Sequence, residues 1–127
     1  MRILIAGCCN AGKTTLSNMF NVITLHTDDV NDLEWSEQSE EVSGWFDDTD
    51  SWIIEGMTVP RALRKWLLRN EDLDCAPADI LIWLNNPKQQ LTDKQKDLSE
   101  GADKVMNEIF DDLIDRGVEI IHSYQTI

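Results

Sequence analysis

Residues 7 to 14, Gly-Cys-Cys-Asn-Ala-Gly-Lys-Thr, have the residue types and spacing of a loop that binds nucleotide phosphates. In a Gly-x-x-x-x-Gly-Lys-Thr loop the backbone N–H groups surround the phosphates, the lysine reaches the β- and γ-phosphates, and the threonine hydroxyl contacts Mg²⁺. The stretch therefore predicts a site for a nucleoside triphosphate with Mg²⁺. Its expected binding positions are Gly7, Asn10, Ala11, Gly12, Lys13, Thr14 and Thr15.

The neighbours of this loop agree with that interpretation. An apolar run, Arg2–Ala6, precedes it and predicts a buried strand, and Lys13–Phe20 after it predicts a helix. A ligand-free strand–helix turn is the alternative, but it gives no reason for Lys13 and Thr14. Cys8 and Cys9 occupy variable positions of the pattern, where small side chains are tolerated beside phosphates; redox chemistry is the other interpretation.

Two acidic residues, Asp28 and Asp29, follow the second apolar run, Val22–Leu25, in the stretch His-Thr-Asp-Asp. Parallel sheets bind ligands at the carboxyl ends of their strands, so carboxylates here are expected to face the ligand. We expect Asp28 to accept a proton from an attacking hydroxyl or to hold Mg²⁺, with Asp29 in support. A helix cap and first-turn acid is the alternative. His26 is expected to be a packed or orienting histidine.

Ser51–Trp66 combines an acidic residue at the end of a strand with a basic helix. Arg61, Arg64 and Lys65 have i, i+3, i+4 spacing, which places three cations on one side of a helix. They bind substrate phosphate in one interpretation and form a solvated face in the other. The stretch resembles the matching part of nucleotide and nucleoside kinases, which implies that Glu55 lies near Mg²⁺ or the acceptor.

Strand and helix patterns alternate along the chain, which predicts one α/β domain over residues 1–127. Its architecture is expected to be three layers around a parallel sheet of about five strands. Predicted strands are Arg2–Ala6, Val22–Leu25, Trp52–Glu55, Asp79–Leu84 and Val118–Ile121. Predicted helices are Lys13–Phe20, Ser36–Phe46, Pro60–Asn70 and Thr92–Arg116, the last of which is expected to end at Gly117.

A polar segment of about residues 86–104 follows the fourth predicted strand and contains Lys88, Lys94 and Lys96. In kinases of this shape the corresponding segment is a lid that closes over the donor phosphates. Gln95 either contacts substrate or completes a capping box with Thr92.

The formal net charge of −13 argues against nucleic acid as a partner, but the charges are segregated. Residues 28–55 hold eleven acidic and no basic residues, whereas eight of the eleven Lys and Arg lie between Arg61 and Lys104. The three cysteines show no metal-site spacing, and no segment predicts a signal peptide or membrane span. These features predict a cytoplasmic protein.

Several stretches together resemble the small phage P-loop kinases that include the 5-hydroxymethyluracil DNA kinases. The resemblance covers about Arg2 to Ile121. It is carried by GCCNAGKTT, HTDDV, EWSEQSEEVSGWFD, WIIEGMTVPRALRKWL, LTDKQ and RGVEI. The chain departs from the group at Cys8-Cys9 and at LSEGADKV, where a more basic lid is expected.

The resemblance implies a P-loop kinase that transfers the γ-phosphoryl group of ATP to the 5-hydroxymethyl group of a pyrimidine in phage DNA, in the host cytoplasm. Lys13, Asp28, Asp29 and Glu55 would act in catalysis, and Thr14, Asp28 and Glu55 would hold Mg²⁺. Arg61, Arg64, Lys65 and Gln95 would bind the substrate, and Trp35 could stack on a base, whereas Trp45 is expected in the core. A kinase for a free nucleoside or nucleotide and a non-enzymatic ATP-binding switch are the alternatives; the oligomeric state is left open.

Overall fold

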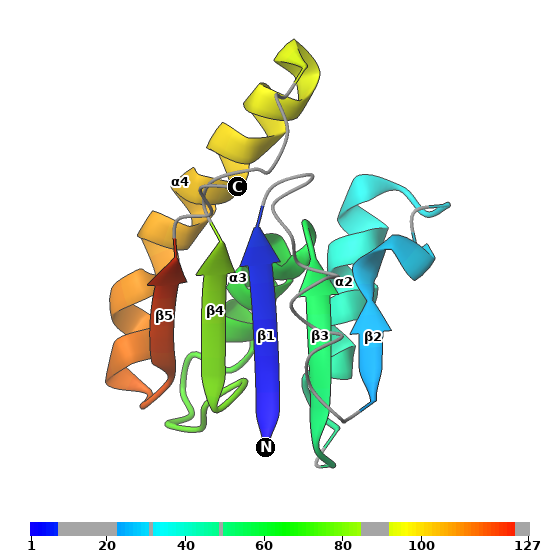
Figure 1. The fold of residues 1–127 in the computed structure, drawn as a ribbon. Coiled ribbons are helices and arrows are strands. Elements are labelled where there is room, and N and C mark those ends of the chain that lie inside the picture. Colours follow the sequence, from blue (N-terminus) through cyan, green and yellow to red (C-terminus); the bar gives the residue numbers. More distant parts are fainter. Residues whose placement is uncertain (8–22, 31, 49, 85–91, 124–127) are drawn as a thin grey trace.

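The fold is an α/β arrangement around a five-stranded sheet in which every strand is parallel to its neighbours (Figure 1). This computed structural model describes residues 1–7, 23–30, 32–48, 50–84 and 92–123. The strand order is β2-β3-β1-β4-β5. The strands are β1 (Arg2–Gly7), β2 (Thr24–His26), β3 (Trp52–Gly56), β4 (Ile80–Leu84) and β5 (Glu119–Ser123).

The strand predictions are confirmed in place and in type, with shifts of one or two residues at their ends. The second strand begins at Thr24 rather than at residue 22 and continues to His26. The third and first strands each extend one residue further, to Gly56 and Gly7. The fifth runs to Ser123, because it pairs with β4 along its whole length and gains a ladder partner at each position.

The helices also lie where the sequence predicts them. They are α2 (Trp35–Trp45), α3 (Val59–Arg69) and α4 (Asp93–Asp115), and a short 3₁₀ helix, η1 (Thr27–Val30), follows β2. The predicted helix Lys13–Phe20 lies outside the described residues. Gly117 ends α4 as expected: with φ of 88° it donates to the Ile114 carbonyl at 3.0 Å, and Val118 donates to Leu113 at 3.1 Å.

Helices α2, α3 and α4 share one face of the sheet, where they enclose the main hydrophobic core. Alternate residues of the central strands, such as Leu4 and Ile54, face this core together with Trp66 and Met106 from the helices. Trp45 packs against it partly buried, as predicted. The intervening strand residues form a second cluster on the opposite face, which contains Ile3, Ile5, Ile53 and Leu84.

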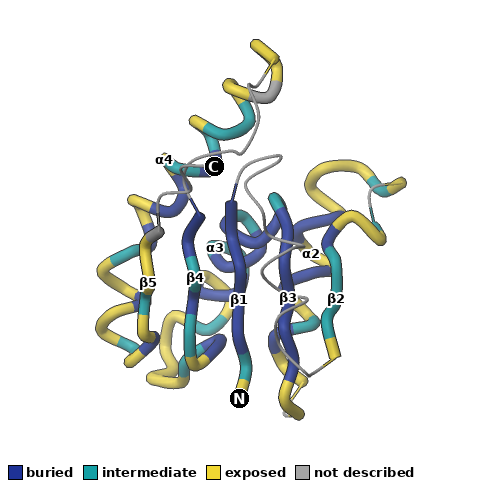
Figure 2. Tube along the Cα trace, viewed as in Figure 1, coloured by how far each residue is buried: buried dark blue, intermediate teal, exposed yellow. Residues whose placement is uncertain are grey.

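The central strands β1 and β3 are the most buried part of the sheet, and β1 lies at its centre (Figure 2). It pairs with β3 on one side and β4 on the other, so its hydrogen-bonding edges are both satisfied inside the sheet. Its outgoing connection leads toward β2, whereas that of β4 leads to β5 in the opposite direction. Strands that diverge in this way open a crevice at their carboxyl ends, where α/β proteins bind ligands.

At the end of β3 a glycine permits a close approach of η1. Gly56 has φ of 145°, and a Cβ built on it would lie 1.7 Å from Thr27 Oγ1. Thr27 is 1% exposed, and its hydroxyl has no hydrogen-bond partner among the described residues. The position therefore requires glycine for its backbone conformation and for the space that Thr27 fills.

We expect Gly56→Ala to lower the free energy of unfolding by about 2–4 kcal/mol, since it combines backbone strain with overpacking against Thr27. Gly44→Ala is the matched control, because its Cβ would meet nothing within 4 Å in α2. That variant should be more stable than the parent by about 0.5–1 kcal/mol. Urea unfolding followed by circular dichroism measures both; equal effects of the two substitutions would contradict the close approach.

Candidate functional site

The carboxyl ends of the parallel strands bring the predicted catalytic segments to one edge of the sheet. β1 ends there at Gly7, the first residue of the predicted phosphate loop, which is buried and opposite Leu84 of β4. The neighbouring strand β3 ends at Gly56 at the same edge. The other predicted loop residues lie outside the described part of the chain: Asn10, Ala11, Gly12, Lys13, Thr14 and Thr15.

Glu55 is a buried carboxylate held by a histidine of the neighbouring strand. The residue is 3% exposed, and its Oε1 lies 2.5 Å from Nδ1 of His26, its register partner on β2. Both side chains lie on the face of Ile53, opposite helices α2 to α4. A buried carboxylate needs such a partner, because without one the free energy of hydration that it loses on burial is not compensated. His26 is thus a partly exposed residue that contacts Glu55, and its role as a packed or orienting histidine stays a prediction.

The two carboxylates of η1 are exposed at the same edge. Asp28 and Asp29 lie in the turn that follows His26, anchored by the buried Thr27. Within the described residues neither carboxylate forms a hydrogen bond or an ion pair. Both residues lie in the first turn of η1, so the alternative of first-turn acids is in part borne out, and their contact with a ligand stays a prediction.

The described residues contain no group of three His, Cys, Asp or Glu side chains arranged to hold a metal ion. Mg²⁺ commonly takes one or two carboxylates and completes its shell with water and substrate phosphates, so the predicted Mg²⁺ site is not tested by this finding. Glu55 and Asp28 offer hard oxygen ligands of that type at one edge. Thr14, the third predicted ligand, lies outside the described residues.

Arg61 occupies a half-buried position where three helices meet. Its guanidinium carbon lies 5.0 Å from the centroid of the Trp35 ring at the start of α2. A Cβ on Gly101 of α4 would come within 2.9 Å of its Nη2. Burial lowers the pKa of Arg61 from its ordinary value, and the charge of Arg64 lowers the pKa further. Among described residues Arg61 has no carboxylate or hydrogen-bond partner.

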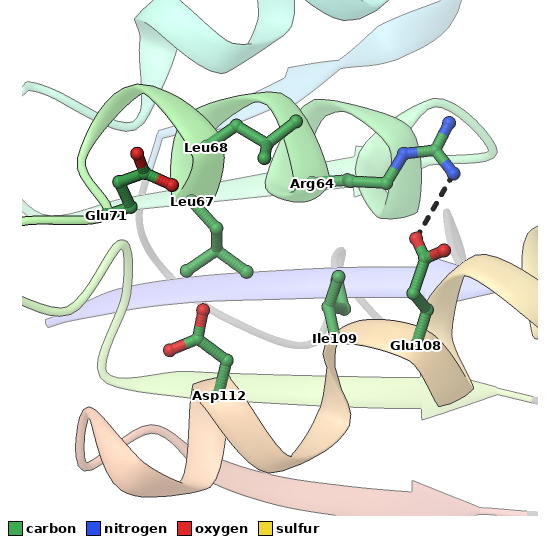
Figure 3. A pocket seen from close by; sticks show the side chains of 7 residues that line it. All are labelled: Arg64, Leu67, Leu68, Glu71, Glu108, Ile109 and Asp112. Carbon is green, nitrogen blue, oxygen red and sulfur yellow. Dashed lines mark hydrogen bonds and ion pairs between the residues drawn. The ribbon is translucent and has the colours of Figure 1, made fainter.

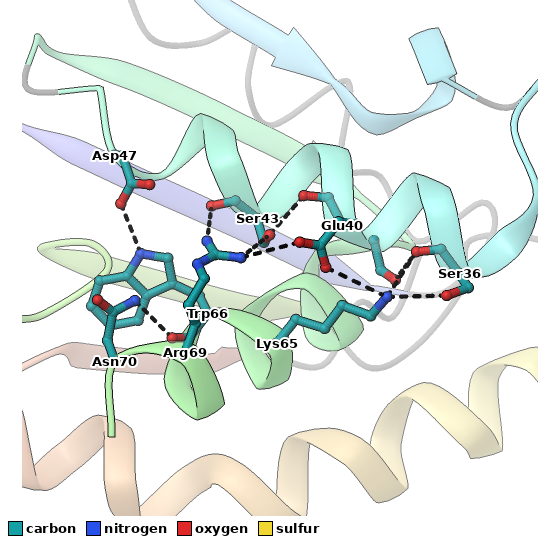
Figure 4. Close-up of polar contacts among 9 residues, drawn as sticks. Ser36, Glu40, Ser43, Asp47, Lys65, Trp66, Arg69 and Asn70 are labelled. Atoms are coloured by element: carbon teal, nitrogen blue, oxygen red, sulfur yellow. Dashed lines mark hydrogen bonds and ion pairs between the residues drawn. The ribbon is translucent and has the colours of Figure 1, made fainter. Parts of the chain in front are cut away.

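The other two predicted phosphate-binding cations point to opposite sides of α3. Arg64 forms an ion pair with Glu108 of α4 at 3.3 Å. Lys65 instead donates to the carbonyl of Ser36 at 2.8 Å and lies 3.8 Å from Glu40 of α2 (Figure 4). The three cations therefore do not form one cluster, because residues 64 and 65 differ by about 100° around a helix axis.

The predicted lid segment is in part the first half of α4. Figure 1 shows that this half of the helix extends beyond the carboxyl edge of the sheet. Residues 92–100 are mostly exposed, as expected for a segment with few neighbours. The backbone of Gln95 lies in this helix, and its side chain is outside the description. The Thr92 carbonyl accepts from the Lys96 N–H at 2.9 Å, which marks the start of the helix.

Further along α4, Asp103 contacts an aromatic pair that the sequence analysis did not identify. Trp83 of β4 and His122 of β5 are register partners, and their rings stack with centroids 4.1 Å apart. Burial raises the pKa of the Asp103 carboxyl, and Glu100 adds to this; a hydrogen bond from Trp83 and the charge of His122 oppose it. The pairing of Trp83 with His122 depends on strand register, which no local pattern in the sequence specifies.

The contacts of His26 and Trp35 were likewise not predicted. Each residue occupies a position that could have drawn attention. His26 is the last residue of β2, and Trp35 is the first residue of the acidic helix α2. Neither signal identifies the partner, because the partners lie 29 and 26 residues away. Only the parallel pairing of β2 with β3 and the packing of α2 on α3 bring them into contact.

Comparisons with known proteins add no family assignment. A scan against protein-family models finds no match, and a search of curated proteins also finds none. The described helices include none long and apolar enough to cross a membrane.

We expect Asp103→Asn to raise the urea midpoint at pH 7. Burial favours the neutral acid in the folded state, so the stability contributed by Asp103 is present at low pH and is lost as the pH rises. Asparagine does not ionise and still offers an acceptor to Trp83. The gain should disappear below about pH 4, where the aspartic acid is itself neutral.

Asp111→Asn is the matched control, because it removes the same charge from an exposed site on the same helix. Its urea midpoint should change little at either pH. A lower midpoint for Asp103→Asn than for the parent at pH 7 would show that the ionised carboxylate is favourable where it lies.

Proposed function

We propose that the protein is a P-loop kinase of three-layer architecture that transfers the γ-phosphoryl group of ATP to a hydroxyl group. One observation carries the proposal: β1, which leads into the phosphate-loop sequence, pairs in parallel with β3, so that Gly7 and Glu55 lie at the same carboxyl edge to which β2 and η1 bring Asp28. A site for phosphoryl transfer needs a phosphate-binding backbone and carboxylates near the same point.

The donor site is proposed from the sequence of residues 7–15. Backbone N–H groups of the loop would hold the ATP phosphates, and Lys13 would neutralise charge on the transferring group. Thr14, Asp28 and Glu55 would hold Mg²⁺, directly or through water. The ion would supply charge neutralisation at the phosphates.

The proton acceptor is proposed to be Asp28, with Asp29 in support. Its carboxylate is exposed at the carboxyl edge and has no competing partner within the described residues, so it is available to a substrate hydroxyl. Glu55 is less suited to that task because it is buried and hydrogen-bonded to His26. Its position supports a role in orienting the metal or the base.

Arg61 is the cation best placed to bind an anionic acceptor. It lies near the N-terminal end of α3, where the helix dipole also favours a negative group. Arg64 and Lys65 already have partners on α4 and α2, so in this structure they offer less charge to a substrate. The exposed ring of Trp35 beside Arg61 provides a surface on which a base can stack.

The proposed acceptor is the 5-hydroxymethyl group of 5-hydroxymethyluracil in phage DNA, on the strength of the sequence resemblance. A free nucleoside or nucleotide is the second candidate. Two observations favour the second: the net charge is −13, and three of the four α3 cations are engaged within the protein. Affinity for DNA increases with each Lys or Arg that is available to neutralise a backbone phosphate, and few cations of α3 are available in this way.

Transfer of labelled γ-phosphate from ATP and Mg²⁺ tests the proposal. The acceptors are a single-stranded 5-hydroxymethyluracil oligonucleotide, its thymine counterpart, and a panel of free nucleosides and monophosphates. Label on the modified oligonucleotide alone supports the DNA kinase, and label on a small acceptor alone supports the second candidate. ATP binding without transfer to any acceptor would overturn the kinase in favour of a switch.

Lys13→Ala should abolish this transfer while the far-ultraviolet circular dichroism and the urea midpoint stay close to those of the parent. The lysine acts on the phosphates rather than on the fold in the proposed site. Parental turnover by a folded Lys13→Ala protein would contradict the phosphate-loop mechanism.

Arg61→Gln should raise KM for a phosphorylated acceptor by about tenfold or more, since a charge-assisted hydrogen bond is lost, and should leave KM for ATP nearly unchanged. Arg69→Gln is the control on the same helix: Arg69 pairs with Glu40 at 3.5 Å, away from the carboxyl edge. Equal effects of the two substitutions on the acceptor KM would place the acceptor elsewhere.

A further inference from the structure

A groove separates α3 from α4 on the surface of the helical layer (Figure 3). Its cavity has a volume of about 400 Å³. Helix α3 starts at the carboxyl edge of the sheet and runs back toward the opposite edge, so Leu68 and Glu71 at its far end lie away from the candidate kinase site. The far end of the groove is thus separate from the proposed site of phosphoryl transfer, although Arg64, a predicted substrate-binding residue, also lines the groove.

The floor of the groove is apolar. Leu67 and Ile109 are buried members of the core whose outer surfaces line the groove, and Leu68 beside them is 66% exposed. Leu73, just beyond the end of α3, is 54% exposed. Leu68, exposed beside this apolar floor, gives the groove a surface that another apolar group can cover.

The rim of the groove is acidic. Glu71, Glu108 and Asp112 line it, against the single cation Arg64, which Glu108 already engages. Asp112 accepts from Arg116 at 2.9 Å, whereas Glu71 has no ion-pair partner among the described residues. The lining therefore carries a net charge of −2, from three carboxylates and one guanidinium.

This charge decides between the possible occupants. Nucleic acid and anionic membranes would be repelled by the rim. A second copy of the chain docked through the same groove would bring like carboxylates together across a twofold axis. An amphipathic segment can place its apolar residues on the floor and its Lys or Arg side chains against the acidic rim. A groove between two helices suits a helix of that type.

We propose that the α3–α4 groove is a docking site for a basic amphipathic helix of a partner protein. The apolar face of the partner helix lies on Leu67, Leu68 and Ile109, and its cations face Glu71 and the neighbouring carboxylates. Leu68 and Glu71 are the residues on which binding depends most directly, since one is exposed and apolar and the other is an acid without an ion-pair partner in the described structure.

The test uses a fluorescently labelled synthetic peptide with leucines on one helical face and lysines on the other, titrated with the full chain and followed by anisotropy. A peptide of the same composition in scrambled order controls for bulk charge. Leu68→Gln and Glu71→Gln are the test variants, and each changes a side chain that little of the fold depends on. Ile114→Gln, 47% exposed on α4, and Glu37→Gln, exposed on α2, are their matched controls.

The proposal predicts that the amphipathic peptide binds more tightly than the scrambled one. Leu68→Gln and Glu71→Gln should each weaken that binding by about fivefold to tenfold, and the two control variants should change it less than about twofold. Binding that the control variants weaken equally, or no preference for the amphipathic order, overturns it. A dimer in sedimentation equilibrium that Leu68→Gln dissociates would identify a second copy as the occupant and overturn it as well.

Discussion

Parallel pairing of β1 with both β3 and β4 is the constraint on which the rest of the structure depends. A strand enclosed on both edges and both faces needs apolar residues, and β1 is apolar and buried from Ile3 to Gly7. Parallel neighbours cannot be joined by tight turns, and the connections from β2 to β3, β3 to β4 and β4 to β5 carry helices α2, α3 and α4 across one face of the sheet. The same pairing collects the carboxyl ends of the strands at one edge. Gly7, Glu55 and the turn after His26 lie near one another for this reason.

The chemistry proposed for that edge depends on two close contacts behind it. The hydrogen bond from His26 compensates the burial of the Glu55 carboxylate and gives it one orientation. The missing side chain of Gly56 lets Thr27 pack against β3, which anchors the turn that carries Asp28 and Asp29. Glu55 is thus a buried acid held by His26, and Asp28 and Asp29 are exposed acids on the turn that Thr27 anchors. This arrangement suits Glu55 to positioning, and Asp28 and Asp29 to contact with substrate.

Helix α3 connects the candidate kinase site to the rest of the surface. Its first turn presents Arg61 at the carboxyl edge, and its α2 side is held by polar contacts such as that of Arg69 with Ser43 (Figure 4). Its α4 side and far end form the acidic groove. The two proposed functions therefore use largely different parts of one helix, with Arg64 between them as both a predicted substrate-binding residue and a residue of the groove lining.

The sequence by itself determined the α/β class, the order and approximate bounds of the elements, and the segments that contain Glu55, Asp28 and Arg61. These follow from apolar periodicity and turn residues, which are local properties of the chain. Only the tertiary structure decided which side chains meet: His26 with Glu55, Arg61 with Trp35, and Arg64 and Lys65 with carboxylates on different helices. Those contacts depend on strand order, register and helix packing, which join residues far apart in the chain and leave no signal in any local stretch.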